Sequence, residues 1–275
     1  MKRSSRVRAC ATTTVGVLAL ALITGCGGGD SGASEKTQDG KTAETATTTK
    51  AATKAELEKL LVATADVSGY KVGMTAEETK AADSKSDLKV AAEVCAPIAY
   101  AVSGFAPGDE AAVVQTKVSQ DAKKPTDTAS ESTGDVSDAE WQAEFAESMN
   151  IDITFLTLSS YDGDGAEKTM KAVSDAVAAC AGGFSIKGST DTTKYAKVAP
   201  VKTSGAGDES VAFSVTGEPD DSEDTPEATG FTYGEVVRHG NTIAAYTTVN
   251  LAKVVSGKPY AVSAPVVKAQ SAKLK

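Results

Sequence analysis

The sequence has 275 residues, of which 28 are Lys or Arg and 37 are Asp or Glu, and it contains a single His. Four of the basic residues and no acid lie in residues 1–25, so residues 26–275 carry 24 basic against 37 acidic side chains. This acidity excludes a nucleic-acid binder, which needs clustered Lys and Arg, and one His excludes most histidine-based metal sites and catalytic triads.

The N-terminal segment has the composition of an export signal. Residues 2–8 hold the four basic residues, and residues 15–23 are almost entirely apolar. That apolar run is far too short to cross a bilayer, which takes about 20 residues. A basic start, a short apolar core and small residues at its end are typical of a secretory signal peptide. We therefore expect residues 1–25 to be removed on export.

The apolar run leads directly into the tetrapeptide Ile23–Cys26 (Ile-Thr-Gly-Cys), which resembles the lipobox of bacterial lipoproteins. The resemblance implies cleavage before Cys26, diacylglycerol on its thiol and an acylated new N-terminus. Palmitate-type chains would then anchor this lipoprotein in the cell membrane, on the extracytoplasmic face. The alternative is an ordinary export signal that happens to contain a cysteine.

The next segment lacks the residues that build a core. Residues 27–52 contain only Gly, Ala, Ser, Thr, Asp, Glu, Lys and Gln, which cannot bury enough apolar area to offset the entropy of ordering. We therefore expect residues 26–52 to form a lipidated, disordered tether. Residues 53–275 remain, enough for a single domain with one sizeable core.

The domain begins with a predicted helix followed by a predicted strand. Thr53 and Glu56 have the spacing of a capping box, in which each side chain bonds to the other residue's backbone N–H. Leucines follow at helical spacing. Tyr70, Val72 and Met74 then alternate with polar residues, which is the two-residue period of a strand.

A second helix, a strand and a long loop are predicted next. Residues 88–103 have a helical pattern that carries Cys95, and Pro97 either kinks this helix or marks a late start. Residues 111–118 have the pattern of a strand. Residues 119–137 are polar and rich in Pro, Ser and Thr, which predicts a surface loop.

The middle of the chain contains the clearest elements. Trp141 and Phe145 lie four residues apart and predict a short amphipathic helix. Residues 151–158 are the most apolar strand candidate, which we expect to be central in a sheet. Residues 164–181 form the clearest predicted helix, and Cys180 falls on its apolar stripe, facing the core.

The C-terminal part changes to a two-residue period. Alternating apolar residues predict strands over 211–215, 231–235 and 243–249, with a hairpin turn at 238–241 between the last two. The acidic segment 217–228 separates the first two strands and predicts a surface loop. A closing helix follows, because Pro265 is acceptable in its first turn.

These elements sum to an α+β fold, in which an antiparallel, meander-like β-sheet has helices packed on one side. Regular alternation of strands and helices is absent from the pattern. This excludes the two wound α/β lobes that are usual in the substrate-binding lipoproteins of ABC importers.

The cysteines indicate one disulfide. If Cys10 leaves with the signal peptide and Cys26 is lipidated, only Cys95 and Cys180 remain. An exported domain lies in an oxidising environment, which favours a disulfide between these two. The alternative is a pair of buried thiols.

No motif in the chain points to catalysis or to a bound cofactor. The acidic segment 162–167 looks like a calcium loop, but Val173 stands where an EF-hand needs a bidentate Glu, so the start of a helix is preferred. His239 is alone in a predicted turn and cannot make a metal site. Nucleophile elbow, Walker and dinucleotide motifs are absent. We expect no catalytic residues, no metal and no cofactor, and therefore no enzyme.

Four tyrosines lie near the ends of predicted elements, where the walls of a cleft form. The alternative is that they are half-buried rims of the core. They are Tyr70, Tyr100, Tyr161 and Tyr195.

Several local patterns occur together: Val94–Pro97 in one predicted helix, Ala179–Phe184 at the end of another, and strand entries at Gly207–Ser210 and Val236–Asn241. The set resembles actinobacterial lipoproteins related to the PknH-like extracellular sensor domain, over roughly residues 54–275. The resemblance implies a disulfide-braced α+β domain with an antiparallel sheet beside helices and a ligand-binding cleft. It carries over no catalytic residues. In that family, the extracellular domains of receptor kinases have two disulfides, whereas this chain can form one.

The functional expectation is a surface lipoprotein whose extracytoplasmic domain non-covalently binds a small molecule or an envelope component. Because the sequence shows no kinase or transmembrane segment, a sensor of this kind would signal through a partner protein. The alternative is a structural or interaction protein of the cell envelope with no small-molecule site. A hydrolase that uses acids alone is the least favoured hypothesis.

Overall fold

The computed structural model describes residues 49–73, 84–122, 147–188, 192–218 and 230–275. Residues 46–275 group into one compact unit. Some predictions concern residues outside the described ones. They are the signal peptide 1–25, lipidation of Cys26, the tether up to residue 48, Met74 in the first strand, the helix at Trp141 and Phe145, and most of the loops 119–137 and 217–228.

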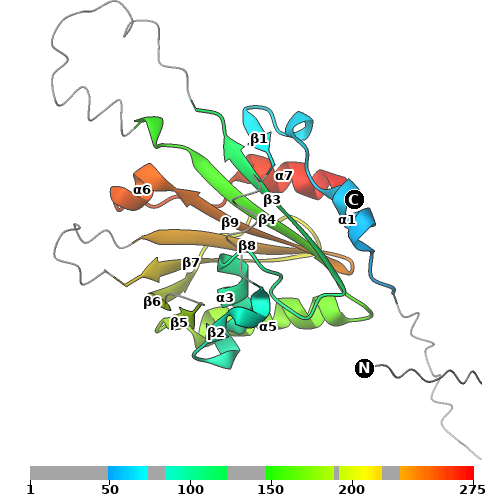
Figure 1. Ribbon diagram of the computed structural model, residues 1–275, viewed down its shortest axis with the longest axis horizontal. Coiled ribbons are helices and arrows are strands. Elements are labelled where there is room, and N and C mark those ends of the chain that lie inside the picture. Colours follow the sequence, from blue (N-terminus) through cyan, green and yellow to red (C-terminus); the bar gives the residue numbers. More distant parts are fainter. Residues whose placement is uncertain (1–48, 74–83, 123–146, 189–191, 219–229) are drawn as a thin grey trace, which may run out of the picture. The chain divides into compact units, whose positions relative to one another are not determined.

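The described residues contain nine strands, which form one antiparallel sheet (Figure 1). Across the sheet the strand order is β1-β3-β4-β9-β8-β7-β6-β5-β2. Five consecutive strands, from β5 to β9, are therefore neighbours in a meander. The sequence predicted a meander-like sheet, but of these five strands it predicted only the last three. In chain order the strands are β1 Tyr70–Val72, β2 Lys89–Val90, β3 Ala112–Gln120, β4 Asp152–Ser160, β5 Phe184–Lys187, β6 Thr192–Pro200, β7 Glu209–Gly217, β8 Phe231–His239 and β9 Thr242–Asn250.

Helices pack against both faces of this sheet. On one face lie α3 and α5, and on the other lie α1 and α7 (Figure 1). A short helix, α6, follows β9 directly. The bounds are α1 Lys54–Leu60, α3 Ala96–Val102, α5 Gly165–Ala179, α6 Leu251–Val255 and α7 Ala264–Lys273, and single 3₁₀ turns cover Thr64–Asp66, Lys85–Asp87 and Glu93–Cys95.

The α+β class and the antiparallel sheet are confirmed, but the helices lie on both faces where the sequence predicted one. The reason is visible in β8 and β9, whose neighbouring residues belong to different cores. Val236 and Ala245 pack against α3 and α5, whereas Val237 and Ala244 pack against α1 and α7. Successive side chains of a strand point to opposite faces. A central strand that is apolar at consecutive positions therefore needs helices on both faces of the sheet.

Local signals account for the elements that were predicted well. The capping box forms as expected, since the Thr53 backbone N–H donates to the Glu56 carboxylate at 2.7 Å and the Glu56 N–H donates to the Thr53 hydroxyl at 3.4 Å. The apolar stripe of α5 is buried from Ala166 to Val177. Gly183 ends this region at φ +91°, where an added Cβ would lie 2.1 Å from a backbone carbonyl oxygen.

Several boundaries differ from the predictions. The helix predicted over 88–103 begins only at Ala96, with Pro97 in its first turn, so the late start is correct and residues 89–90 form an edge strand instead. Strand β3 continues to Gln120, beyond the predicted start of the loop at residue 119. Strand β4 is interior, but it is third from the sheet edge and not central.

The domain also begins earlier than residue 53. Residues 49–52 are hydrogen-bonded to it: the Gly163 N–H donates to the Thr49 carbonyl at 2.9 Å, and the Ala52 N–H donates to the Ser160 hydroxyl at 2.9 Å. These backbone bonds need no apolar side chains. Composition does not reveal such bonds, so the sequence prediction placed residues 49–52 in the tether.

Candidate functional site

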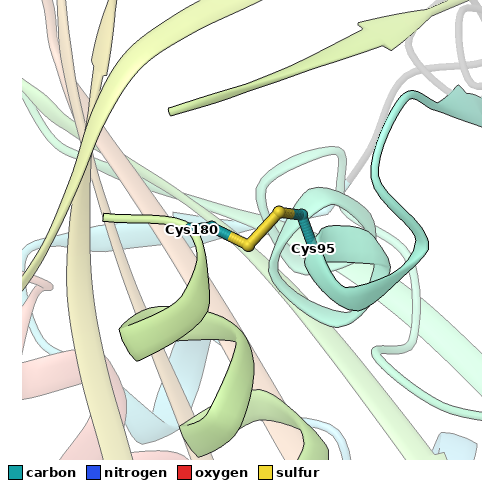
Figure 2. The surroundings of a disulfide bond; sticks show 2 residues. All are labelled: Cys95 and Cys180. Carbon is teal, nitrogen blue, oxygen red and sulfur yellow. A yellow bond between two sulfur atoms is a disulfide. The ribbon is translucent and has the colours of Figure 1, made fainter. Parts of the chain in front are cut away.

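The predicted disulfide joins Cys95 and Cys180, with an S–S distance of 1.98 Å. It links the turn that precedes α3 to the end of α5 (Figure 2). Both residues are buried in the core on the α3 and α5 face. The bond therefore braces two helices on one side of the sheet, and its burial gives it a structural role.

The other residues singled out in the sequence do not converge on one site. Tyr70 and Tyr161 are buried in different cores, with hydroxyls that contact Ser263 at 3.1 Å and Ser159 at 3.2 Å. None of the four tyrosines lines either part of the cleft described below. Tyr100 and Tyr195 are half-buried, as the core-rim interpretation expects, whereas Tyr70 and Tyr161 are buried. The acidic segment at 162–167 is the start of α5, as expected.

A cleft lies on the α1 and α7 face, between α7, the β6–β7 connection (residues 201–208) and the β8–β9 turn. We call it the α7 cleft. Its outer groove has a volume of about 810 Å³, and its inner chamber has a volume of about 220 Å³. Ser204, Ala264 and Val267 line both parts, so the chamber adjoins the groove beneath the first turns of α7.

Glycines allow the loop walls of the groove to approach the sheet. Gly205 and Gly207 have φ values of +71° and +69°, and a Cβ on Gly207 would lie 2.3 Å from the carbonyl oxygen of Arg238. A side chain at position 207 would therefore push the β6–β7 connection away from β8. The segments 207–210 and 236–241, two of the patterns behind the sequence resemblance, both contribute residues to this groove.

The groove contains buried polar atoms that lack partners. Ser271 on α7 is 8% exposed, and within the described part of the chain neither its hydroxyl nor His239 Nε2 has a hydrogen-bond partner. The Ser271 hydroxyl lies near enough to the Tyr246 hydroxyl to oppose part of the rise in the pKa of Tyr246, yet the two form no hydrogen bond of normal geometry. Unsatisfied buried polar atoms are rare in folded proteins, so their grouping beside a cavity marks this region.

Burial also affects ionisation around the cleft. Desolvation lowers the pKa of His239 below its ordinary value, although the Asp208 carboxylate opposes part of this shift. Desolvation raises the pKa of the Tyr246 phenol, which therefore stays neutral at physiological pH. The exposed rim of the groove carries Lys268 and Lys275 opposite Asp208.

The inner chamber ends at a carboxylate. Glu235, on the middle strand β8, is 3% exposed. The backbone N–H and the hydroxyl of Ser204 both donate to its Oε1, each at 2.7 Å. The cross-strand neighbour of Glu235 is Tyr246. The sequence showed Glu235 only as one position in an alternating strand, because no local signal indicates that both faces of β8 are covered.

Two kinds of feature are absent from the described residues. These residues contain no group of three or more His, Cys, Asp or Glu side chains that could hold a metal ion. They also contain no helix with the length and apolar character needed to cross a membrane.

No protein-family model and no curated protein matches this sequence. Among solved structures, the chain is similar to the extracellular domain of PknH from Mycobacterium tuberculosis, with 13% sequence identity and a TM-score of 0.45. The match covers 82% of this chain and 97% of that chain. It is the type of domain that the sequence resemblance named, and at this level of similarity it carries no conclusion about what the present chain binds.

Proposed function

We propose that this chain is an extracytoplasmic binding domain that captures a small molecule non-covalently in the α7 cleft. The observation that carries the proposal is the cleft itself, whose outer groove of about 810 Å³ lies within the 300–1,000 Å³ typical of small-molecule sites. Small and apolar residues make up much of its wall. Beside it, the Ser271 hydroxyl and His239 Nε2 are buried and have no hydrogen-bond partner within the described residues.

We favour binding over catalysis because Ser271 and His239, beside the groove, are not paired as nucleophile and base through His239 Nε2. A nucleophile needs a base within hydrogen-bond distance, and His239 Nε2 makes no hydrogen bond within the described residues. Binding is favoured over a purely structural role in the envelope because a structural surface has no need of a cavity that adjoins a buried carboxylate.

We further propose that lipid on Cys26 holds the domain at the outer face of the cell membrane. The support is the sequence pattern of residues 2–26, in which a basic start and a short apolar run lead into the lipobox-like tetrapeptide. Labelling cells with a radioactive fatty acid should tag the protein, and a Cys26→Ser variant should lose the label. Label that persists in this variant would refute the anchor.

Native mass spectrometry of the full chain, extracted gently from its own host, tests the binding function. We expect a fraction of the protein to carry a non-covalent adduct of small-molecule mass. Ala272→Trp, which fills the outer groove from the exposed side of α7, should abolish the adduct. Ala181→Trp is the matched control, because Ala181 is also exposed but lies at the end of α5 on the opposite face. An adduct that survives Ala272→Trp, or a chain that is empty in every preparation, would contradict the proposal.

A further inference from the structure

Glu235 is the buried charge that the fold leaves without a counter-ion. It lies on the middle strand of the sheet and is 3% exposed, and no ion pair to it occurs among the described residues. The one arginine of the domain, Arg238, is three residues away on the same strand. Its guanidinium instead lies 3.6 to 3.9 Å from the carboxylates of Glu209, Asp208 and Glu167.

One oxygen of Glu235 remains unused. Both hydrogen bonds from Ser204 go to Oε1, and Oε2 receives none within the described part of the chain. The walls of the inner chamber beside it are mostly apolar, with Val201, Ala212 and Val262 among them. Oε2 is not among the fully buried polar atoms without a partner, so it keeps an accessible surface, and Glu235 lines the chamber. A carboxylate with little water around it is stabilised by a cation or by further donors. The chamber, at about 220 Å³, has room for a small cationic group.

We propose that the inner chamber binds the protonated amine of the ligand, with Glu235 as its counter-ion, while the outer groove holds the rest of the molecule. This inference rests on the proposed function and names the chemical class of its ligand: a primary amine with an extended, largely uncharged body. A hydrogen bond between ammonium and carboxylate is roughly twice as strong as one between neutral groups. A single carboxylate does not suit Ca²⁺ or Mg²⁺, which take six or more oxygen ligands.

Lys202 is the rival for this role within the chain. Lys202 lines the inner chamber, yet it is exposed and forms no ion pair with Glu235 in the structure. An exposed lysine keeps its ammonium in water, so pairing with Glu235 would require it to give up that hydration. The ammonium group of the ligand also loses its hydration when it pairs with Glu235. Burial of the ligand's apolar body in the groove compensates for this loss.

The test uses a pair of probes of similar size, n-butylammonium and 1-pentanol, added to the full chain and followed by shifts of backbone amide signals in NMR spectra. We expect butylammonium to bind and to shift signals of residues 201–204 and 235, and we expect pentanol to bind at least about tenfold more weakly. Glu235→Gln keeps the shape and the acceptor for Ser204 but removes the charge, and it should weaken butylammonium binding by at least about tenfold. Glu218→Gln makes the same change of net charge at an exposed site and should leave binding unchanged.

Each other outcome overturns the ammonium site and leaves the proposed function to be judged by its own experiment. Equal binding of pentanol, or unchanged binding in Glu235→Gln, would show that the chamber does not recognise charge. If neither probe binds, the ammonium site is also refuted. If Lys202 is the partner of Glu235, Lys202→Gln will lower the melting temperature, and butylammonium will bind only to that variant. Thermal melts of Glu235→Gln should show an equal or higher melting temperature, because a buried charge has been removed.

Discussion

The two faces of the sheet are built differently although the same strands serve both. Behind α3 and α5 the core contains the Cys95–Cys180 disulfide, and its buried polar side chains are hydroxyls such as those of Thr157 and Thr247, which donate to carbonyls at α3. Behind α1 and α7 the buried residues include Glu235, Gln270 and Ser271, and the α7 cleft opens there. The difference teaches that one face carries a covalent brace and the other a cleft beside buried polar groups. Under the proposed function, the second face is the one that binds a ligand.

This division makes distinct predictions for variants on each face. On the α3 and α5 face, substitutions should lower the stability of the whole domain and leave ligand binding intact in molecules that remain folded. On the α1 and α7 face, substitutions should affect binding more strongly the closer they lie to the cleft. The predictions below run from the largest expected effect to the smallest.

The disulfide should make the largest single contribution to stability. The double variant Cys95→Ala, Cys180→Ala should lose about 3–5 kcal/mol of unfolding free energy, because the bridge closes a separation of 85 residues. Urea unfolding of the oxidised wild type and the variant measures this loss. At temperatures where the variant stays folded, its ligand binding should match that of the wild type. A loss below about 1 kcal/mol would contradict the bracing role of this face.

Gln270 should be the most important polar side chain on the opposite face. It is fully buried, accepts a hydrogen bond from the Val62 N–H at 2.8 Å and donates one to the Leu60 carbonyl at 2.8 Å. Gln270→Leu leaves both backbone groups unsatisfied, so we expect a loss of about 2–4 kcal/mol in the same unfolding assay.

The control for this change lies on the same helix. Lys273→Leu removes an exposed ion pair with Asp66 at 3.1 Å, and exposed pairs contribute little to stability. An equal loss in Gln270→Leu and Lys273→Leu would show that α7 is not held to the end of α1 by the buried amide.

A larger side chain in the core on the α3 and α5 face should destabilise the domain. A Cβ on Gly234 would lie 2.7 Å from the Phe213 ring, which is fully buried. Gly234→Ala should therefore lower the unfolding free energy by about 1–3 kcal/mol through overpacking. Gly182→Ala is the matched control, since an added Cβ there meets no atom within 4 Å. Thermal melting distinguishes the two, and equal melting temperatures would argue that this core is loosely packed.

The smallest expected effect is on the pH dependence of stability, through His239 beside the groove. Burial lowers the pKa of His239 below 6.5 in the folded chain, so between that folded value and 6.5 the unfolded chain binds more protons. Stability should fall modestly as pH drops through this window, because protonation of the half-buried ring disfavours the fold. His239→Gln should remove this part of the pH dependence, measured by urea unfolding between pH 7.5 and pH 5. A His239→Gln profile identical to that of the wild type would show that the ring is solvated.

Local chemistry explains which parts of the fold were predictable. Thr53 with Glu56 and the stripe of α5 are signals contained within a few residues, as is the turn at Gly240. Strand β6 was missed because its positions are mostly exposed Thr and Lys near the sheet edge, where no apolar period develops. The position of α7 on the second face depends on which side of β8 and β9 each residue faces, and this is a property of the assembled sheet.

The cleft was beyond sequence reasoning for a different reason. Ser204, Glu235 and Ser271 are far apart in the chain and belong to a connection, a strand and a helix, and only the antiparallel arrangement brings them together. None of the three belongs to a motif. The disulfide could be predicted because Cys is rare and pairs only with Cys, whereas Ser and Glu occur throughout the surface.

The central claim is that the two faces differ in function, and amide chemical-shift mapping tests it most directly. The full chain, isotope-labelled and freed of bound molecules, is titrated with the small-molecule extract of its own host. The account predicts shifts clustered on α7, residues 201–208 and the β8–β9 turn, with α3, α5 and the disulfide unaffected. Shifts centred on α3 and α5, or no shifts on either face, would contradict it.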